Sequence, residues 1–296
     1  VFGTACPSSN LGGPIAGSQT STFCEPMMNP SSHSAGSSGD CTDRVLAAVV
    51  LAAGRGSRMG SDLPKVLHVV AGRTMLDWVV DAALSAGAHR VVVVVGYGQE
   101  QVRESMVFRS NVVFAEQHEQ LGTGHAALCA ESAVGDANDV LVLAGDGPLV
   151  RPSVLKRLVA SHRDSSAAAS MATASIDKPT GYGRVLRDDQ GHFSAIVEQK
   201  NATPEQLMIS EVNPSYYCFD RESLFGVLHG LRPDKTGGEY YLTDVPGILK
   251  ANGRHVGLLD EVPQQDVLSI NTHEQLAQVD EILRGRMASQ ASGDQA

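Results

Sequence analysis

The feature that most constrains this chain is a turn rich in glycine and arginine that directly follows an apolar run. Residues 45–53 are all apolar, and they lead into Gly54-Arg55-Gly56-Ser57-Arg58-Met59, with Pro64-Lys65 shortly after. Glycines let the backbone approach an anion, successive N–H groups bind anions, and cationic side chains supply charge. The sequence therefore predicts a phosphate-handling loop at the end of a buried strand.

Composition restricts the class of protein. With 296 residues, of which 42% are hydrophobic and 19% charged, the chain can bury a full core. The net charge of −10 argues against a nucleic-acid partner or an anionic membrane, so Arg58 and Lys65 indicate a local site. No run approaches the roughly 20 apolar residues of a membrane span. The five cysteines form no CxxC pair, which favours reduced thiols and a cytoplasmic location.

Both ends of the chain differ from its middle. Residues 1–43 are rich in Ser, Gly, Pro, Thr and Asn and show no apolar period, which predicts a disordered segment or an over-extended gene start. No basic segment precedes an apolar one, so we expect no signal peptide. Residues 287–296 are expected to form a disordered tail. Residues 44–286 are expected to form the folded domain.

In that domain, apolar runs alternate with segments of helical period. We expect strands at 46–52, 90–95, 112–115 and 140–144 and helices at 75–86, 100–106 and 124–133, which describes βαβ units on a parallel sheet. Beyond about residue 165 we expect strands at 167–174, 183–186, 192–198, 212–219 and 255–259 and helices at 221–231, 242–251 and 272–286. Ligands of such α/β folds bind beyond the carboxyl ends of the strands, where the glycine-rich loop and Gly145-Asp146 are expected to lie.

Two familiar phosphate motifs do not fit the first loop. A P-loop needs a second glycine where Met59 stands, and the dinucleotide fingerprint needs a third glycine that this loop lacks. Gly122-Thr123-Gly124-His125-Ala126-Ala127 fits G-x-G-x-x-A by spacing, but alone it indicates only a tight turn that starts a helix. These mismatches exclude a P-loop ATPase and leave the reaction open.

An ordered set of motifs over about residues 45–286 resembles the uridylyltransferase half of bacterial N-acetylglucosamine-1-phosphate uridylyltransferases. The segments that carry the resemblance are 51–59, 64–67, 117 with 120–126, 145–146, 179–184, 196–198, 211–213, 238–244 and Asn271. The resemblance implies a Rossmann-like, glycosyltransferase-A-like α/β nucleotidyltransferase with a mostly parallel sheet and a smaller β-rich sugar-binding portion. It implies transfer of UMP from UTP to N-acetylglucosamine 1-phosphate with Mg²⁺, a step in peptidoglycan precursor synthesis.

The resemblance also assigns roles to single residues. Arg58 would contact the departing pyrophosphate and Lys65 the α-phosphate, while the 54–57 backbone wraps the triphosphate. Asp146 and Asn271 would bind Mg²⁺, although Asn271 alone also suits a helix N-cap. The nucleotide-binding set is Leu51, Ala52, Ala53, Gly54, Gly56, Lys65, Gln117, Gly122 and Thr123, and the sugar-binding set is Gly183, Glu198 and Asn213.

Some positions depart from the family. Pro214-Ser215 replaces a small residue and a glycine after Asn213, and Ala144 replaces a larger residue of some members, which leaves the sugar open. The alternatives are a related enzyme with another sugar phosphate, another NTP or a molybdopterin acceptor, and a non-catalytic nucleotide-binding subunit. Because the family's acetyltransferase half is not in this sequence, we predict no acetyl transfer and expect a monomer.

Overall fold

The computed structural model describes residues 44–56, 59–234 and 237–292, which belong to one compact unit. Residues 1–43 and 293–296, and with them the prediction of a disordered or misplaced N-terminal segment, lie outside the described residues. Arg58 lies outside them too. In the part of the chain that is described, no helix is long and apolar enough to cross a membrane.

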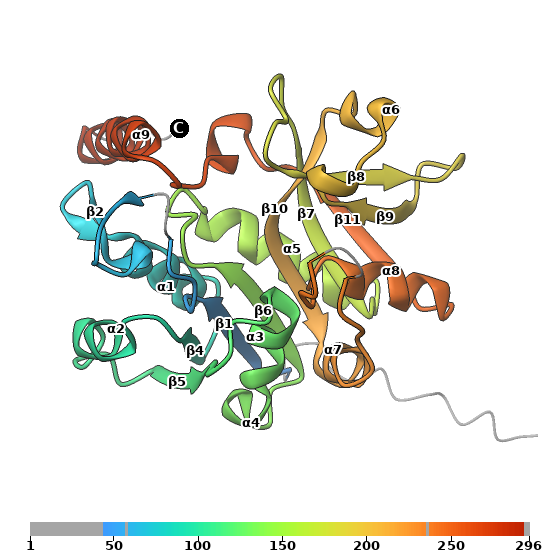
Figure 1. Cartoon of the computed structure of the whole chain (residues 1–296), viewed down its shortest axis with the longest axis horizontal. Helices are drawn as coiled ribbons and strands as arrows, with labels where there is room; N and C mark the ends of the chain where they lie inside the picture. Colours follow the sequence, from blue (N-terminus) through green and yellow to red (C-terminus); the bar gives the residue numbers. More distant parts are fainter. Residues whose placement is uncertain (1–43, 57–58, 235–236, 293–296) are drawn as a thin grey trace, which may run out of the picture. The chain divides into compact units, whose positions relative to one another are not determined.

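A mixed sheet forms the centre of the unit, in the order β5-β4-β1-β6-β10-β7-β11 (Figure 1). The strands are β1 (Leu46–Leu51), β4 (Arg90–Val95), β5 (Val112–Glu116), β6 (Asp139–Ala144), β7 (Ala169–Ser175), β10 (Glu211–Asp220) and β11 (Val256–Asp260). β5, β4, β1 and β6 are parallel, whereas β10 is antiparallel to both β6 and β7. The predicted α/β class with a mostly parallel sheet is confirmed.

A hairpin extends the sheet on the side of β10. β8 (Gly183–Arg187) and β9 (Phe193–Val197) pair antiparallel, and β8 pairs with residues 212–213 of β10. α6 (Pro204–Leu207) follows the hairpin. These strands form the smaller β-rich portion that the sequence predicts.

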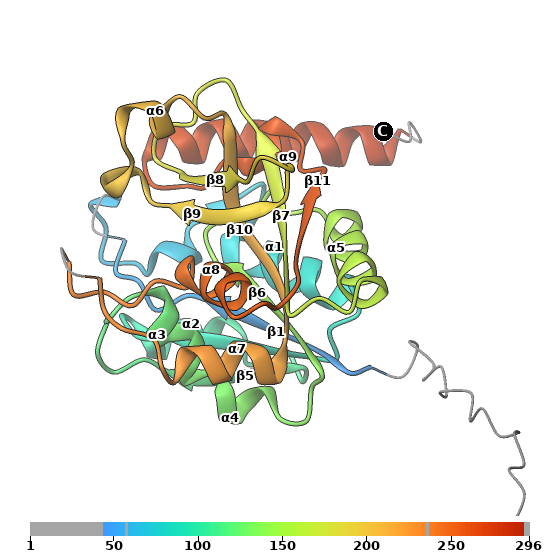
Figure 2. The same ribbon diagram turned by 90° about the vertical axis from the view of Figure 1, so that its right-hand side faces the viewer.

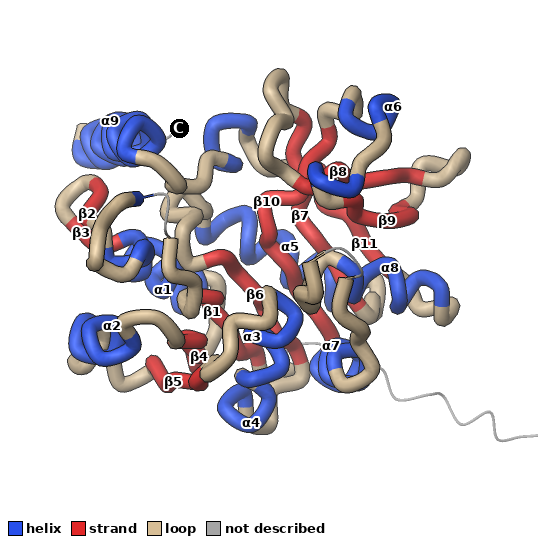
Figure 3. The backbone as a smooth tube through the Cα atoms, in the orientation of Figure 1, coloured by secondary structure: helices blue, strands red, loops and turns tan. Residues whose placement is uncertain are grey.

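Helices cover both faces of the sheet (Figure 3). α1 (Met75–Ser85), α2 (Gln99–Ser105) and α5 (Pro152–Asp164) share one apolar cluster with Ala48 and Val50 of β1. α3 (Thr123–Cys129), α4 (Glu131–Val134), α7 (Arg221–Leu228) and α8 (Asp244–Ala251) share the other cluster with Ala47 and Val49. Alternate residues of β1 therefore enter opposite cores, which is why its sequence is apolar without interruption.

The C-terminal helix forms a third, smaller core. α9 (His273–Ala291), which runs along the top of Figure 2, packs on the hairpin of β2 (Val69–Val70) and β3 (Arg73–Thr74), where Val279 shares a core with Val70 and with Met75 of α1. The prediction of a disordered tail from residue 287 is wrong up to Ala291, because the helix continues through these residues. The helix begins with a capping box between Thr272 and Gln275, so the alternative of Asn271 as its N-cap is also wrong.

Other elements also differ from the expectations. The helix expected at 124–133 is divided at Ala130 into α3 and α4. α5 was not anticipated, although Pro152 at its first turn and buried Val154, Leu155, Leu158, Val159 and His162 have the spacing of an amphipathic helix.

A buried charge network holds α5 against the amino end of β6. Asp139 is completely buried and accepts hydrogen bonds from Arg44 (2.6 Å) and Arg163 (2.7 Å). Burial alone would raise the pKa of the Asp139 carboxyl, but these guanidinium groups hold it below its ordinary value. His162 lies 3.7 Å from the same carboxylate and contacts the Ser170 hydroxyl (3.1 Å). Burial lowers the pKa of His162, so its neutral form is favoured in the fold.

We expect His162 to make the protein less stable in mild acid. Because its pKa is lower in the folded than in the unfolded chain, its contribution is complete above the ordinary value of 6.5 and is lost as pH falls from that value through the lower pKa of the folded state. Urea unfolding at pH 7.5 and pH 5.5 measures the loss. His162→Gln should reduce it, whereas His118→Gln, at an exposed position, should not. Equal pH dependence in all three proteins would contradict the assignment.

Candidate functional site

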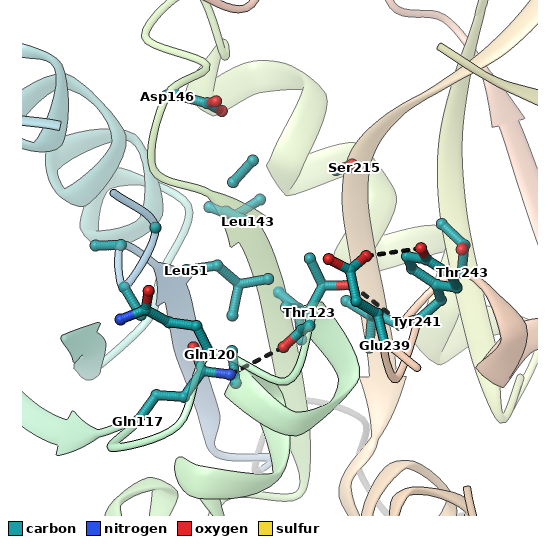
Figure 4. Close-up of a pocket in the computed structure, with 18 of the residues that line it drawn as sticks. Leu51, Gln117, Gln120, Thr123, Leu143, Asp146, Ser215, Glu239, Tyr241 and Thr243 are labelled. Atoms are coloured by element: carbon teal, nitrogen blue, oxygen red, sulfur yellow. Dashed lines mark hydrogen bonds between the residues drawn. The ribbon is translucent and has the colours of Figure 1, made fainter. Parts of the chain in front are cut away.

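The parallel strands end side by side at one edge of the sheet. In register, Leu51 of β1 pairs with Val94 of β4 and with Ala144 of β6. The segments after these strands line a cavity of about 530 Å³ (Figure 4). Predicted site residues in its wall are Leu51, Ala52, Ala53, Gly54, Gly56, Lys65, Gln117, Gly122, Thr123, Asp146 and Glu198. One cavity thus joins residues from both the nucleotide-binding and the sugar-binding predictions.

The glycine-rich loop packs closely on the side chain of Lys65. Gly56 has a φ of +63°, and a Cβ built on it would lie 2.6 Å from the Lys65 Cβ. Only glycine fits this backbone conformation and this approach without strain. Gly54 differs, because a Cβ there would meet no heavy atom of the described residues within 4 Å, so its backbone faces open space among them. The loop therefore supports the lysine stem and leaves room beside Gly54 for a ligand.

Lys65 joins two residues that lie far apart in the chain. Its ammonium donates a hydrogen bond to the Asp146 carboxylate and another to Asn271 Oδ1 at 2.8 Å. The side chains of Lys65 and Asp146 are only 12% and 25% exposed, so the ion pair is largely shielded from solvent. The structure thus brings together three residues that the resemblance assigns to phosphate and metal binding.

Backbone hydrogen bonds fix this convergence. Gly145 N–H donates to the carbonyl of Leu51 (3.0 Å), which holds the turn after β6 against β1. Ile270 N–H donates to the carbonyl of Asp146 (3.1 Å), which places the next residue, Asn271, beside the carboxylate. Spacing in the sequence contains no signal for this second contact.

The donor set fits a hard divalent cation. Asp146 supplies a carboxylate and Asn271 an amide oxygen, and Mg²⁺ needs only one or two protein oxygens besides water and substrate phosphates. Among the described residues, no group of three or more His, Cys, Asp or Glu side chains is close enough to hold a metal ion. The residues therefore suit Mg²⁺ better than a metal that demands a complete protein cage.

Gln117 follows β5 and is oriented by a glycine carbonyl. It is 4% exposed, and its Nε2 donates to the carbonyl of Gly122 (3.0 Å) and lies 3.1 Å from His125 Nδ1. A carbonyl can only accept, so the amide nitrogen faces Gly122. His125, on the first turn of α3, thus contacts Gln117 and helps to hold it in the site.

Some backbone groups of residues 51–53, which belong to the predicted nucleotide-binding set, are already hydrogen-bonded within the protein. Ala52 N–H donates to Val94 O (3.0 Å), and Ala53 O accepts from Tyr97 N–H (3.1 Å). The carbonyl of Leu51 also accepts from Gly145 N–H. The Ala52 N–H is therefore not available to a nucleobase, whereas each of the two carbonyl oxygens keeps a second lone pair that can accept a further hydrogen bond.

A segment at 238–244 closes the side of the cavity near Gly122. The Tyr240 backbone donates to Leu121 O (2.8 Å) and accepts from Gly124 N–H (2.7 Å), as in a short strand pairing. Thr123 accepts from Leu242 N–H through its hydroxyl (3.0 Å). The glycines of the G-x-G-x-x-A stretch thus allow the backbone of residue 240 to lie close against this loop. Gly122, and not Thr123, is the N-cap residue of α3.

Gly122 should tolerate no side chain. Its φ is +105°, and a Cβ would lie 2.6 Å from the carbonyl oxygen of Tyr240. We expect Gly122→Ala to lower the free energy of unfolding by about 2 kcal/mol or more, in urea titrations. Gly226→Ala in α7, where no atom lies within 4 Å, is the control and should not destabilise. Equal stability of both variants would refute the proposed fit.

The sugar-side residues lie together on the β-rich portion. Glu198 follows β9 and accepts a hydrogen bond from the Thr243 hydroxyl (2.9 Å). Gly183 lies against it, since a Cβ there would be 3.8 Å from both Glu198 carboxylate oxygens. Asn213 pairs with Gly183 across β10 and β8. Glu198 lines the cavity, whereas Gly183 and Asn213 are not part of its lining.

Several cavity residues had no assigned role in the sequence analysis. Among them are Ser215, Tyr217, Glu239, Tyr241 and Thr243. Figure 4 shows Gln117 and Gln120 on one side of the cavity and Tyr241 and Thr243 on the other. The Glu239 carboxylate accepts a hydrogen bond from Tyr241 (2.7 Å), and this bond raises the pKa of the phenol. The signal for three of these residues was the 238–244 motif, which carried part of the resemblance.

Asn213 is engaged within the protein and shapes a bulge in β10. Its Nδ2 donates to the Tyr217 hydroxyl (2.5 Å), and its Oδ1 accepts from Ser215 N–H (3.0 Å). The register of β10 against β7 shifts between Val212 and Tyr216, and Ser215 has a φ of +65°. The departure from glycine at residue 215 therefore falls on a left-handed backbone position that glycine adopts more easily.

We expect Ser215→Gly to stabilise the protein. Removing the Cβ relieves a left-handed conformation that costs about 1–2 kcal/mol for L-residues, although the freer unfolded glycine chain offsets part of this gain. Urea unfolding should show a net increase, whereas Ser215→Ala, which retains the Cβ, should show none. A loss of stability in Ser215→Gly would mean that the serine side chain stabilises the bulge more than its backbone strains it.

Known proteins are similar to this chain over most of its length. The bifunctional protein GlmU of Pelotomaculum thermopropionicum is 48% identical over 243 residues, which cover 82% of this chain and 53% of that protein. The bifunctional protein GlmU of Syntrophomonas wolfei is 44% identical over 241 residues, covering 81% and 54%. The chain therefore spans about half the length of the curated relatives it matches, and the resemblance expected from the sequence is confirmed.

A solved structure and a family model are also similar to this chain. The crystal structure of UDP-glucose pyrophosphorylase complexed with UDP-glucose has a TM-score of 0.69 and 17% identity, and the match covers 82% of this chain and 99% of that chain. At 17% sequence identity, this similarity shows a shared fold alone. Residues 48–236 match the model of the MobA-like NTP transferase domain. The chain belongs to the MobA-like NTP transferase domain family.

Proposed function

We propose that this chain transfers UMP from UTP to N-acetylglucosamine 1-phosphate and releases pyrophosphate. One observation carries the proposal: a single cavity has Gln117 and Gly122 on one wall, Glu198 and Thr243 on another, and the Lys65–Asp146 pair in the same lining. A nucleotide and a sugar phosphate that react with each other need adjoining subsites and a cation near the reacting phosphate. The similarity to GlmU proteins supports this substrate pair.

The residues suit in-line displacement at phosphorus. An oxygen of the sugar phosphate attacks the α-phosphorus of UTP, a new P–O bond forms, and the bond to the β-phosphate oxygen breaks. No protein nucleophile is needed, because the attacking oxygen is already ionised. Lys65 is assigned to the α-phosphate and Arg58 to the leaving pyrophosphate, while the backbone beside Gly54 faces the open space for the triphosphate.

Mg²⁺ would be held by Asp146 and Asn271, the two residues whose oxygens meet at the Lys65 ammonium. When bound, it neutralises charge on the phosphate oxygens and helps to orient them. Backbone hydrogen bonds donated by Gly145 and Ile270 fix the positions of the two segments that carry Asp146 and Asn271. The presence of both proposed Mg²⁺ ligands beside Lys65 favours a catalytic protein over a subunit that only binds a nucleotide.

Recognition of the two substrates is assigned to opposite walls. Gln117 offers an amide to the uracil edge, and the Gly122 backbone lies beside it. Glu198, held by Thr243, offers a carboxylate to sugar hydroxyls, and a site built for such bonds penalises a sugar that lacks them. Gly183, which lies against Glu198, and Asn213, which pairs with Gly183, are assigned to the support of this wall. We further propose that the chain binds neither nucleic acid nor anionic membranes, because its net charge is −10.

A substrate panel tests the reaction. Purified protein with Mg²⁺ is given UTP, CTP, GTP or ATP with N-acetylglucosamine, glucose or glucosamine 1-phosphate, or with a molybdopterin acceptor, and pyrophosphate release is measured. UTP with N-acetylglucosamine 1-phosphate should give the highest kcat/KM. Release with another pair but none with this one would favour a related nucleotidyltransferase. No release with any pair would favour a nucleotide-binding subunit.

Asp146→Asn should lower kcat by about two orders of magnitude or more, since metal stabilisation of phosphoryl charge amounts to several kcal/mol. Asp164→Asn, an exposed residue at the end of α5, is the charge-matched control and should retain activity. The measurement is kcat at saturating metal and both substrates. A near-normal kcat in Asp146→Asn would remove Asp146 from the proposed metal site.

A further inference from the structure

The residues proposed to hold Mg²⁺ already surround a cation that belongs to the chain. The Lys65 ammonium donates to the Asp146 carboxylate and to Asn271 Oδ1, the two oxygen-bearing groups proposed as metal ligands. The ion pair is largely shielded from solvent. A shielded carboxylate favours an adjacent positive charge, because the unpaired ion is costly to desolvate. In this structure the Lys65 ammonium supplies that positive charge.

Lys65 is anchored in a way that restricts where its ammonium can go. Its stem lies against the backbone of Gly56, and it begins a short 3-10 helix (Lys65–Leu67) whose other residues, Val66 and Leu67, are buried. Only the outer part of the side chain can change position. From this anchor it reaches the cavity that holds the glycine-rich loop, where a triphosphate would offer a second anionic partner.

A metal ion and this ammonium compete for the same oxygens. Both are cations, both use the Asp146 carboxylate, and like charges in a partly buried site repel strongly. A metal that approaches this site has to displace an ion pair that is already formed. Displacement is easier when a phosphate receives the released ammonium, so metal and nucleotide binding support each other.

We propose that Lys65 acts as an internal counter-ion that occupies the metal site until the nucleotide arrives with its metal. Lys65 is then released from Asp146 and Asn271 toward the α-phosphate. The inference rests on the assignment of Asp146 and Asn271 as metal ligands in the proposed function. Its distinctive consequence is that removal of a catalytic lysine strengthens metal binding to the nucleotide-free protein.

Binding of Mn²⁺ tests this consequence without any turnover. Free Mn²⁺ is measured by electron paramagnetic resonance during titration of the full chain, with no nucleotide present. Lys65→Met should bind Mn²⁺ about tenfold more tightly than wild type, or more, within the usual range of coupling between sites. Lys65→Gln, which retains a polar end, should also bind more tightly and serves if the Met variant does not fold.

Two controls separate this effect from general changes in charge. Lys156→Met removes an exposed lysine from α5 and should leave Mn²⁺ affinity unchanged. Adding Asp146→Asn to Lys65→Met should abolish the gain. Unchanged or weaker binding in a folded Lys65 variant would overturn the inference, as would an equal gain in Lys156→Met.

The result can be distinguished from failure of the proposed reaction. If the Lys65 variants bind Mn²⁺ more tightly but UTP and N-acetylglucosamine 1-phosphate give no pyrophosphate, the counter-ion role stands and the proposed substrates are wrong. If pyrophosphate is released but the Lys65 variants show no gain in Mn²⁺ affinity, the reaction stands and the counter-ion role is wrong.

Discussion

The contact of Lys65 with Asp146 and Asn271 is the interaction on which the arrangement of the site depends. It joins the segment after β1, the turn after β6 and the segment that leads into α9, which lie far apart in sequence. The parallel sheet makes this possible, because its strands end at one edge and deliver their following segments to the same place. The charge that holds these segments together is also the charge that phosphate chemistry uses.

The second organising feature is the 238–244 segment, which contacts both sides of the cavity. Its Tyr240 backbone pairs with the loop beside Gly122, and its Thr243 hydroxyl holds the Glu198 carboxylate. The nucleotide-side loop and the sugar-side carboxylate are therefore positioned by one short piece of chain. The bulge at Ser215 is a local exception to good backbone geometry beside the same cavity, and such exceptions are common where a site imposes its own shape.

The sequence predicted what local patterns encode. Uninterrupted apolar runs identified the parallel strands because both faces of the sheet are covered, and the glycine-rich turn after β1 identified the phosphate loop. Contacts between distant segments were not visible: no pattern near Lys65 points to Asn271, and only the family resemblance paired it with Asp146. α5 was missed despite its amphipathic spacing. The end of α9 was missed because residues 287–291 are mostly exposed and carry no core-facing pattern, although they continue a helix begun by the Thr272 cap. The role of Arg58 remains a prediction from the sequence, outside the described residues.

A double-mutant cycle on Lys65→Met and Asp146→Asn measures the central contact most directly, with free energies of unfolding obtained from urea titrations in metal-free buffer. If the shielded ion pair organises the site, the two substitutions should be non-additive, with a coupling free energy of about 1 kcal/mol or more. Additivity to within about 0.3 kcal/mol would show that the two residues act independently. That result would contradict the view that this pair holds the three segments of the site together.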